Sequence, residues 1–204
     1  QAFWKWVVDE GELKTSPMAK MSPPTIPEEA VPILSDDDIA QLLRACEGQE
    51  FEDRRDMAIV RLLMDTGMRL SELAGLNVDS IDWDLNLVMC WGKGGRQRPV
   101  PFGKKTARAV DRYIRARSRH RDADRTELWL GLRGPMQRGG NGIAQALTKR
   151  CQRAKMKHIH PHQLRHLFAH RWLQAGGQET DLMALAGWRS RSMVSRYAAS
   201  AAQD

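Results

Sequence analysis

Apolar positions recur at intervals of three and four residues through most of this chain, which is the spacing of helices with one buried face. Ser35 stands before three aspartates and predicts a helix N-cap, because its side chain can accept from free first-turn amides. Helices are also expected at residues 51–65, where Gly67 is placed to end the helix, and at residues 70–76. The later part of the chain predicts helices at about residues 104–119, 141–154, 161–174, 179–185 and 192–199.

The pattern changes to that of strands between Ser80 and Pro101. Residues 80–91 carry strand-forming side chains around a turn at residues 84–86, and the chain returns at 96–101 after a glycine-rich turn. The prolines of the returning segment predict an edge strand, because proline has no N–H for a neighbour. Loops are expected at residues 133–135 and 138–140. The expected fold is mainly α with a small three-stranded antiparallel β-sheet.

The N-terminal part differs from the rest. Residues 3–8 form an apolar helical stub that contains two tryptophans and has no local partner, so we expect the end of a domain that is otherwise missing. Repeated prolines in residues 21–34 predict an extended linker. The main domain is expected to span residues 35–204.

Composition narrows the environment and the partner. The formal net charge is +7, which favours a polyanion, above all nucleic acid. Cys46, Cys90 and Cys151 are few and widely spaced, without a metal-binding or disulfide pattern, so a reducing cytoplasmic setting is expected. Cys46 and Cys90 lie in apolar runs and are expected in the core. No apolar run approaches the roughly 18 residues of a membrane span.

Some of the polar residues suit cleavage of a phosphodiester. Without a metal, that reaction needs a nucleophile, cations around the non-bridging oxygens and an acid for the leaving oxygen. Arg69 begins a short helix and can offer a fork of N–H donors to a phosphate, although a pair with Glu72 would explain it without any function. His162 and Arg165 share one face near a helix N-terminus, where free amides favour an anion.

Other candidates also have structural explanations, and for Lys93 taken alone the structural one is favoured. Lys93 lies in a glycine turn and is either a solvated lysine or a cation that reaches a DNA groove. The indole of Trp188 can donate to a phosphate while its ring packs in the core. His162, His166 and His170 recur every four residues, but no carboxylate or cysteine joins them at ligand spacing. We therefore expect no metal and no other cofactor, and we expect His166 and His170 to be packing residues.

The chain has two tyrosines, so the choice of a tyrosine nucleophile is narrow. Tyr113 shares helical spacing with Val110 and Ile114 and is expected in the core. Tyr197, on a short terminal helix, is the remaining candidate. A phenol with a pKa near 10 is a poor nucleophile at neutral pH and needs a base and cations beside it.

The order and spacing of these residues resemble the tyrosine recombinase (phage integrase) family. The resemblance covers roughly residues 31–200 and implies that family's catalytic-domain fold, with residues 1–20 as the end of a core-binding domain and 21–34 as its linker. The matching runs are TGMRLSEL at 66–73, GKGGRQRPVP at 92–101, HQLRH at 162–166, the Gly187–Trp188 pair and Tyr197.

The resemblance also implies a mechanism and its residues. Tyr197 attacks the scissile phosphate and forms a 3′-phosphotyrosyl bond, and Lys93 protonates the departing 5′-oxygen. The 5′-hydroxyl of a second strand then attacks the phosphotyrosyl bond. Because that bond conserves the energy of the broken one, neither ATP nor a metal is needed. Trp188 stands where most members have histidine, so it packs or donates a hydrogen bond. The implied catalytic residues are Arg69, Lys93, His162, Arg165, Trp188 and Tyr197, with Glu72 and His166 in support.

We therefore expect a site-specific DNA recombinase or integrase that is cytoplasmic and nucleoid-associated, with double-stranded DNA as its partner. A tetramer on DNA is expected for the full-length protein, while a monomer remains open for this chain alone, since only seven residues follow Tyr197. Two other readings stay open. One is a type IB topoisomerase-like enzyme with the same cleavage step, and the other is a non-catalytic DNA-binding relative.

Overall fold

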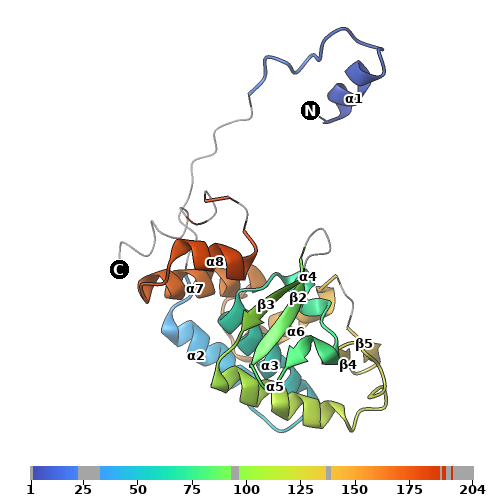
Figure 1. The fold of residues 1–204 in the computed structure, drawn as a ribbon. Helices are drawn as coiled ribbons and strands as arrows, with labels where there is room; N and C mark the ends of the chain where they lie inside the picture. The colour runs from blue at the N-terminus through green and yellow to red at the C-terminus, as the bar shows by residue number, and fades with distance from the viewer. Residues whose placement is uncertain are drawn as a thin grey trace.

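The computed structural model describes residues 2–22, 33–92, 97–136, 139–188, 190–191 and 194. The predicted candidates Lys93 and Tyr197, and most of the terminal helix expected at 192–199, lie outside these ranges. The described helices are α1 (Ala2–Asp9), α2 (Asp36–Ala45), α3 (Phe51–Thr66), α4 (Leu70–Ala74), the 3-10 helix η1 (Val78–Ser80), α5 (Lys104–Arg117), α6 (Asn141–Arg153), α7 (Pro161–Gln174) and α8 (Glu179–Ala186) (Figure 1).

The predicted antiparallel sheet is present. It contains β1 (Ile81–Asp82), β2 (Leu87–Trp91) and β3 (Gln97–Pro101) in that order. Val88 of β2 lies opposite Ile81 on one side and Val100 on the other, and all three are buried. The proline-bearing β3 is an edge strand, as expected.

A second, two-stranded sheet was not predicted. Residues 133–135 were expected to be a loop, but Gly134–Pro135 forms β5 and pairs with β4 (Leu130–Gly131). A pairing of two residues on each side is too short to show the alternation by which strands are recognised.

Helix ends are defined by the residues that the sequence marked. Ser35 caps α2, accepting from the Asp38 amide at 3.1 Å while the Asp38 carboxylate accepts from the Ser35 amide at 3.1 Å. Gly67 ends α3 with φ +55° and Gly187 ends α8 with φ +66°, both in the left-handed region that glycine favours. These two glycines place the C-terminal carbonyls of α3 and α8 near the candidate site.

Helix α3 is central to the core and packs against α5 and α7 (Figure 1). Tyr113 of α5 is fully buried and stacks on Trp129 with ring centroids 5.2 Å apart. Its hydroxyl donates to the Leu128 carbonyl at 2.8 Å and accepts from the Leu130 amide at 2.9 Å. Burial raises its pKa to about 12. Tyr113 is therefore a core residue, as predicted.

All three cysteines are free and buried, which confirms the core placement of Cys46 and Cys90. Helix α1 confirms the expected N-terminal helix, and none of its residues is buried. A second, smaller apolar cluster lies beside α7 and α8. It consists of Phe168, Ala169, Leu182, Ala186, Trp188 and Val194.

Candidate active site

Arg69 stands at the N-cap of α4, directly after the turn that ends α3. Its Nη1 donates to Glu72 Oε1 at 2.9 Å, and its backbone amide donates to Glu72 Oε2 at 2.7 Å. Nη2 donates to the Gly187 carbonyl at 2.9 Å. The side chain is still 42% exposed. The expected pair with Glu72 therefore exists, and it holds a guanidinium that keeps access to solvent.

Glu72 is shared between two arginines. Its side chain is only 4% exposed, and besides Arg69 it accepts from Nη1 and Nη2 of Arg98 at 2.8 and 2.9 Å. Burial alone would raise the pKa of this carboxyl, but hydrogen bonds from Arg98 and from the amide and guanidinium of Arg69 lower it to about 2. Glu72 is therefore an ionised carboxylate, and each of its oxygens accepts hydrogen bonds from both Arg69 and Arg98.

Arg98 was not predicted as a site residue. It comes from β3, where the two-residue period of a strand places it on the same side as the buried Val100. A charged residue at an inward position of an edge strand was the available signal, and its partner Glu72 lies 26 positions away.

Arg165 comes from α7 and is 3% exposed. Its Nη1 donates to the Gly67 carbonyl and its Nη2 donates to the Ala186 carbonyl at 2.7 Å. The guanidinium carbon lies 5.1 Å from the ring centre of Trp188, a cation–π distance. Trp188 thus supports Arg165 from the apolar cluster in which it is packed.

The C-terminus of α8 brings the three arginines together. Three consecutive carbonyls, those of Leu185, Ala186 and Gly187, each accept from a different arginine: Arg98, Arg165 and Arg69. The last carbonyls of a helix have no partner within the helix and carry its negative partial charge, so guanidinium groups suit them. Three arginines and one carboxylate leave this cluster with a formal charge of +2, which suits a phosphate.

The model of the phage integrase family matches residues 32–204 of this sequence. This chain belongs to that family. The tyrosine recombinase XerC of Chromobacterium violaceum is 33% identical over 198 residues, covering 97% of this chain and 65% of that protein. XerC of Azotobacter vinelandii is 32% identical over 191 residues, covering 92% and 62%. The chain thus spans less than two thirds of the length of these relatives.

Solved structures show the same fold. The XerA recombinase superposes with a TM-score of 0.74 at 24% identity, covering 91% of this chain and 65% of that one. The Tn1549 transposon integrase in complex with circular intermediate DNA gives a TM-score of 0.70 at 20% identity, covering 100% and 75%. The predicted fold class, a phage integrase catalytic domain with a small three-stranded sheet, is confirmed.

Three histidines of this phage integrase domain, His162, His166 and His170, lie along α7. His162 is exposed near the start of the helix, and its ring lies 4.3 Å from that of His166, edge to face. Partial desolvation of its ring, together with the charge of Arg165, lowers the pKa of His162. Burial, together with His162 and Arg165, lowers the pKa of His166 to about 4. Neutral imidazoles at pH 7 can accept a proton, which is the chemistry expected of His162.

His166 and His170 are buried, as predicted for packing residues. Within the described ranges, no group of three or more histidine, cysteine or acidic side chains is arranged to hold a metal ion. In the same ranges, no helix is both long and apolar enough to cross a membrane.

Between Trp188 and Tyr197 the structure describes residues 190, 191 and 194. Val194, three positions before Tyr197, is 1% exposed and packs in the cluster that contains Trp188. The geometry of Tyr197 and Lys93 themselves lies outside the described residues, so their predicted roles rest on the sequence.

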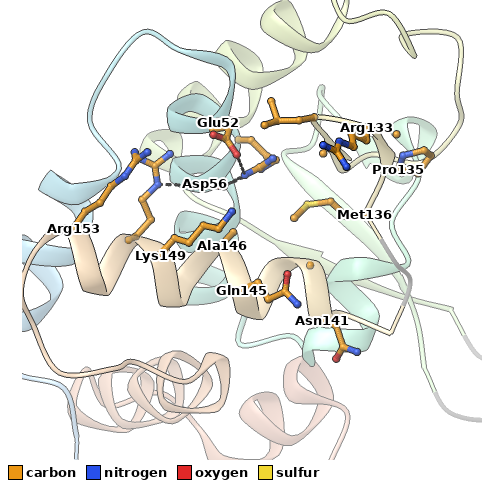
Figure 2. A pocket seen from close by; sticks show the side chains of 16 residues that line it. Glu52, Asp56, Arg133, Pro135, Met136, Asn141, Gln145, Ala146, Lys149 and Arg153 are labelled. Carbon is orange, nitrogen blue, oxygen red and sulfur yellow. Dashed lines mark hydrogen bonds and ion pairs between the residues drawn. The ribbon is translucent and has the colours of Figure 1, made fainter.

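A hollow of about 550 Å³ lies elsewhere, between α6 and the β4–β5 hairpin. Figure 2 shows Gln145 and Lys149 of α6 across from Arg133 of the hairpin. Beneath it, Arg150 bridges to Asp56 at 2.7 Å and so ties α6 to α3. Of the predicted catalytic residues that the structure describes, none lines this hollow. Its buried charges are explained as structural ion pairs.

Proposed function

We propose that this chain is the catalytic domain of a site-specific DNA recombinase that cuts and rejoins strands through a 3′-phosphotyrosyl intermediate. The convergence of Arg69 and Arg165 at the end of α8 carries this proposal. The two residues are 96 positions apart (165 − 69), yet their guanidinium groups bond to adjacent carbonyls. Structural ion pairing alone would not require one of them to remain 42% exposed.

The cleavage step moves two protons and builds negative charge on the phosphate, and each of these has a residue to serve it. In the cleavage step, the phenolic oxygen of Tyr197 bonds to phosphorus as the bond to the 5′-oxygen breaks. The phenolic proton passes to His162, whose neutral ring can take it, and Lys93 gives a proton to the 5′-oxygen. Arg69 and Arg165 stabilise the negative charge of the five-coordinate phosphate. The free 5′-hydroxyl of another strand completes exchange by the reverse reaction.

Trp188 has a supporting role in this scheme. Its indole ring lies beneath the Arg165 guanidinium, which two carbonyls also hold. A planar aromatic ring in this place restricts the tilt of the guanidinium without adding a titratable group. We therefore assign Trp188 to positioning Arg165 and donating a hydrogen bond, and not to proton transfer.

Double-stranded DNA is the proposed partner. The formal charge of +7 supports it, as do similar proteins whose structures were solved with DNA, including the Tn1549 integrase and the XerH recombinase on its difH substrate. The proposed setting is the cytoplasm, in association with the nucleoid. A tetramer on DNA remains the prediction for the full-length protein.

A trapping experiment tests the proposal. DNA bound by the full-length protein is recovered and sequenced, and a duplex of that site is nicked near the cleavage position so that the cut strand diffuses away. We expect an SDS-resistant protein–DNA adduct with the wild type and none with Tyr197→Phe. Tyr113→Phe is the control, since it removes the other phenol and should keep the adduct.

Adduct trapping and a plasmid relaxation assay together separate this proposal from its alternatives. An adduct with Tyr197→Phe would refute the nucleophile, and strong inhibition by EDTA would refute a metal-free mechanism. Relaxation of a supercoiled plasmid that lacks the recovered site would indicate topoisomerase-like activity instead of site-specific exchange.

A further inference from the structure

Arg98 is a partly buried cation beside the candidate active site, and its N–H donors are directed at other protein groups. Its Nε donates to the Leu185 carbonyl at 2.9 Å, and its two Nη atoms donate to the two oxygens of Glu72 at 2.8 and 2.9 Å. Its side chain is 15% exposed, against 42% for Arg69. Arg98 therefore has the geometry of a residue that acts through Glu72 and not on a phosphate.

The charge balance shows what Arg98 adds. Glu72 accepts from the amide and from Nη1 of Arg69, so these two residues alone would form a neutral pair. A neutral pair attracts a phosphate much less than a free guanidinium does. The bidentate contact of Arg98 supplies a second positive charge to the same carboxylate. The trio then carries a formal charge of +1, and the exposed member of it is Arg69.

Arg98 also joins three separate parts of the fold. It lies on β3, its carboxylate partner lies on α4, and its carbonyl partner lies in the last turn of α8. Arg69 bonds to the same carboxylate and to the carbonyl of Gly187, the C-cap of α8. The two guanidinium groups therefore share the Glu72 carboxylate and bond to carbonyls at the same end of α8, so a shift of one changes the position available to the other.

We propose that Arg98 is a positioning residue for strand cleavage, because it neutralises Glu72 and fastens β3 to α8, so that the group keeps a net positive charge and Arg69 stays oriented toward the scissile phosphate. This inference rests on the proposed function. The low pKa of Glu72, to which the Arg98 hydrogen bond contributes, agrees with it.

A double-mutant cycle tests the coupling. Single-turnover adduct formation and DNA affinity are measured for wild type, Arg98→Met, Glu72→Gln and the double variant, on the nicked duplex recovered with the full-length protein. Arg98→Met should slow adduct formation roughly tenfold, within the range for residues in one hydrogen-bond network. DNA affinity should fall by less than the rate of adduct formation does, because Arg98 acts on one phosphate through Arg69 and does not itself contact the DNA.

The Glu72→Gln background distinguishes positioning from general support of the fold. With no carboxylate charge to neutralise, the further loss caused by Arg98→Met should shrink to within about twofold. Arg98→Lys should be intermediate, since an ammonium keeps the charge but cannot contact both oxygens. Arg115→Met removes an exposed arginine with an acidic partner on α5 and should match the wild type.

A second measurement needs no DNA. The carboxyl carbon of Glu72 is followed by NMR through a pH titration of this chain, with unfolding curves to show that each variant is folded. Arg98→Met should raise the pKa of Glu72 from about 2 toward its ordinary value of 4.5, and Arg115→Met should leave it unchanged.

Two results would overturn the positioning role. The first is an Arg98→Met variant that is folded and cleaves at the wild-type rate. The second is an equal loss from Arg98→Met with and without the Glu72 carboxylate. If wild type itself forms no Tyr197-dependent adduct, the proposed function fails, and the positioning role fails with it.

Discussion

Replacement of Gly187 by alanine would test whether the end of α8 sets the position of the arginines. Gly187 has φ +66°, and a Cβ built there would lie 3.1 Å from Arg98 Nη1 and 3.3 Å from Arg69 Nη1. Ordinary van der Waals contacts of a Cβ lie at 3.4–4 Å. Gly187→Ala therefore changes both the backbone preference and the space that the two guanidinium groups occupy.

A matched variant separates these two effects. Gly176 also has a left-handed backbone, with φ +76°, and a Cβ there would meet nothing within 4 Å. A side chain in this conformation costs about 1–2 kcal/mol. In a chain of this size that cost lowers the melting temperature by about 2–8 °C. Both variants should show this loss of stability, and only Gly187→Ala should move the arginines.

The expected kinetic effect follows from the displacement. The guanidinium groups must give way by a few tenths of an ångström at Gly187. A misplacement of about 1 Å can cost about a hundredfold in rate, so a shift of this size should slow adduct formation by about threefold to tenfold. The assay is single-turnover adduct formation at a temperature where unfolding curves show both variants folded. Equal rates for Gly187→Ala and Gly176→Ala would refute the reasoning.

Three further predictions follow from the same structure. Gly67→Ala should destabilise the chain more than Gly176→Ala does in thermal unfolding, because its Cβ would lie 2.2 Å from Phe168 Cδ1. Stability should fall as pH drops from about 6.5 to about 2. His166 (pKa about 4, ordinarily 6.5) and Glu72 (pKa about 2, ordinarily 4.5) both bind protons more weakly when folded, so protons favour the unfolded chain across this range. Unfolding curves should show His166→Gln flattening the upper part of this fall and Glu72→Gln the lower part; unchanged curves would contradict the assignment. DNA affinity should fall with salt by about 0.9 log units per phosphate contact per decade, and salt-insensitive binding in a titration would contradict recognition through phosphates.

Local patterns were enough to predict most of the fold. Helix α7 was predicted with its observed bounds, and the ends of α3, α4, α5, α6 and α8 differ from expectation by one or two residues. Ser35 and Gly67 were identified because caps depend on a few adjacent residues. The β4–β5 hairpin was not predicted, because its strands of two residues are too short to show the alternation of a strand.

In the candidate site too, local contacts were predictable from the sequence and contacts between distant elements were not. The contact of Arg69 with Glu72 was predictable, since residues three apart on a helix are neighbours. The meeting of Arg69, Arg98 and Arg165 was not, because it depends on where α8 ends relative to α3, α4 and β3. A carbonyl leaves no mark in the sequence, and Leu185, Ala186 and Gly187 contribute only their carbonyls to the arginines. What the sequence does record is Gly187: a left-handed residue ends α8 and leaves room for the guanidinium groups of Arg69 and Arg98. The glycine of the Gly187–Trp188 pair therefore positions the site from the backbone, while its tryptophan positions Arg165 from the side chain.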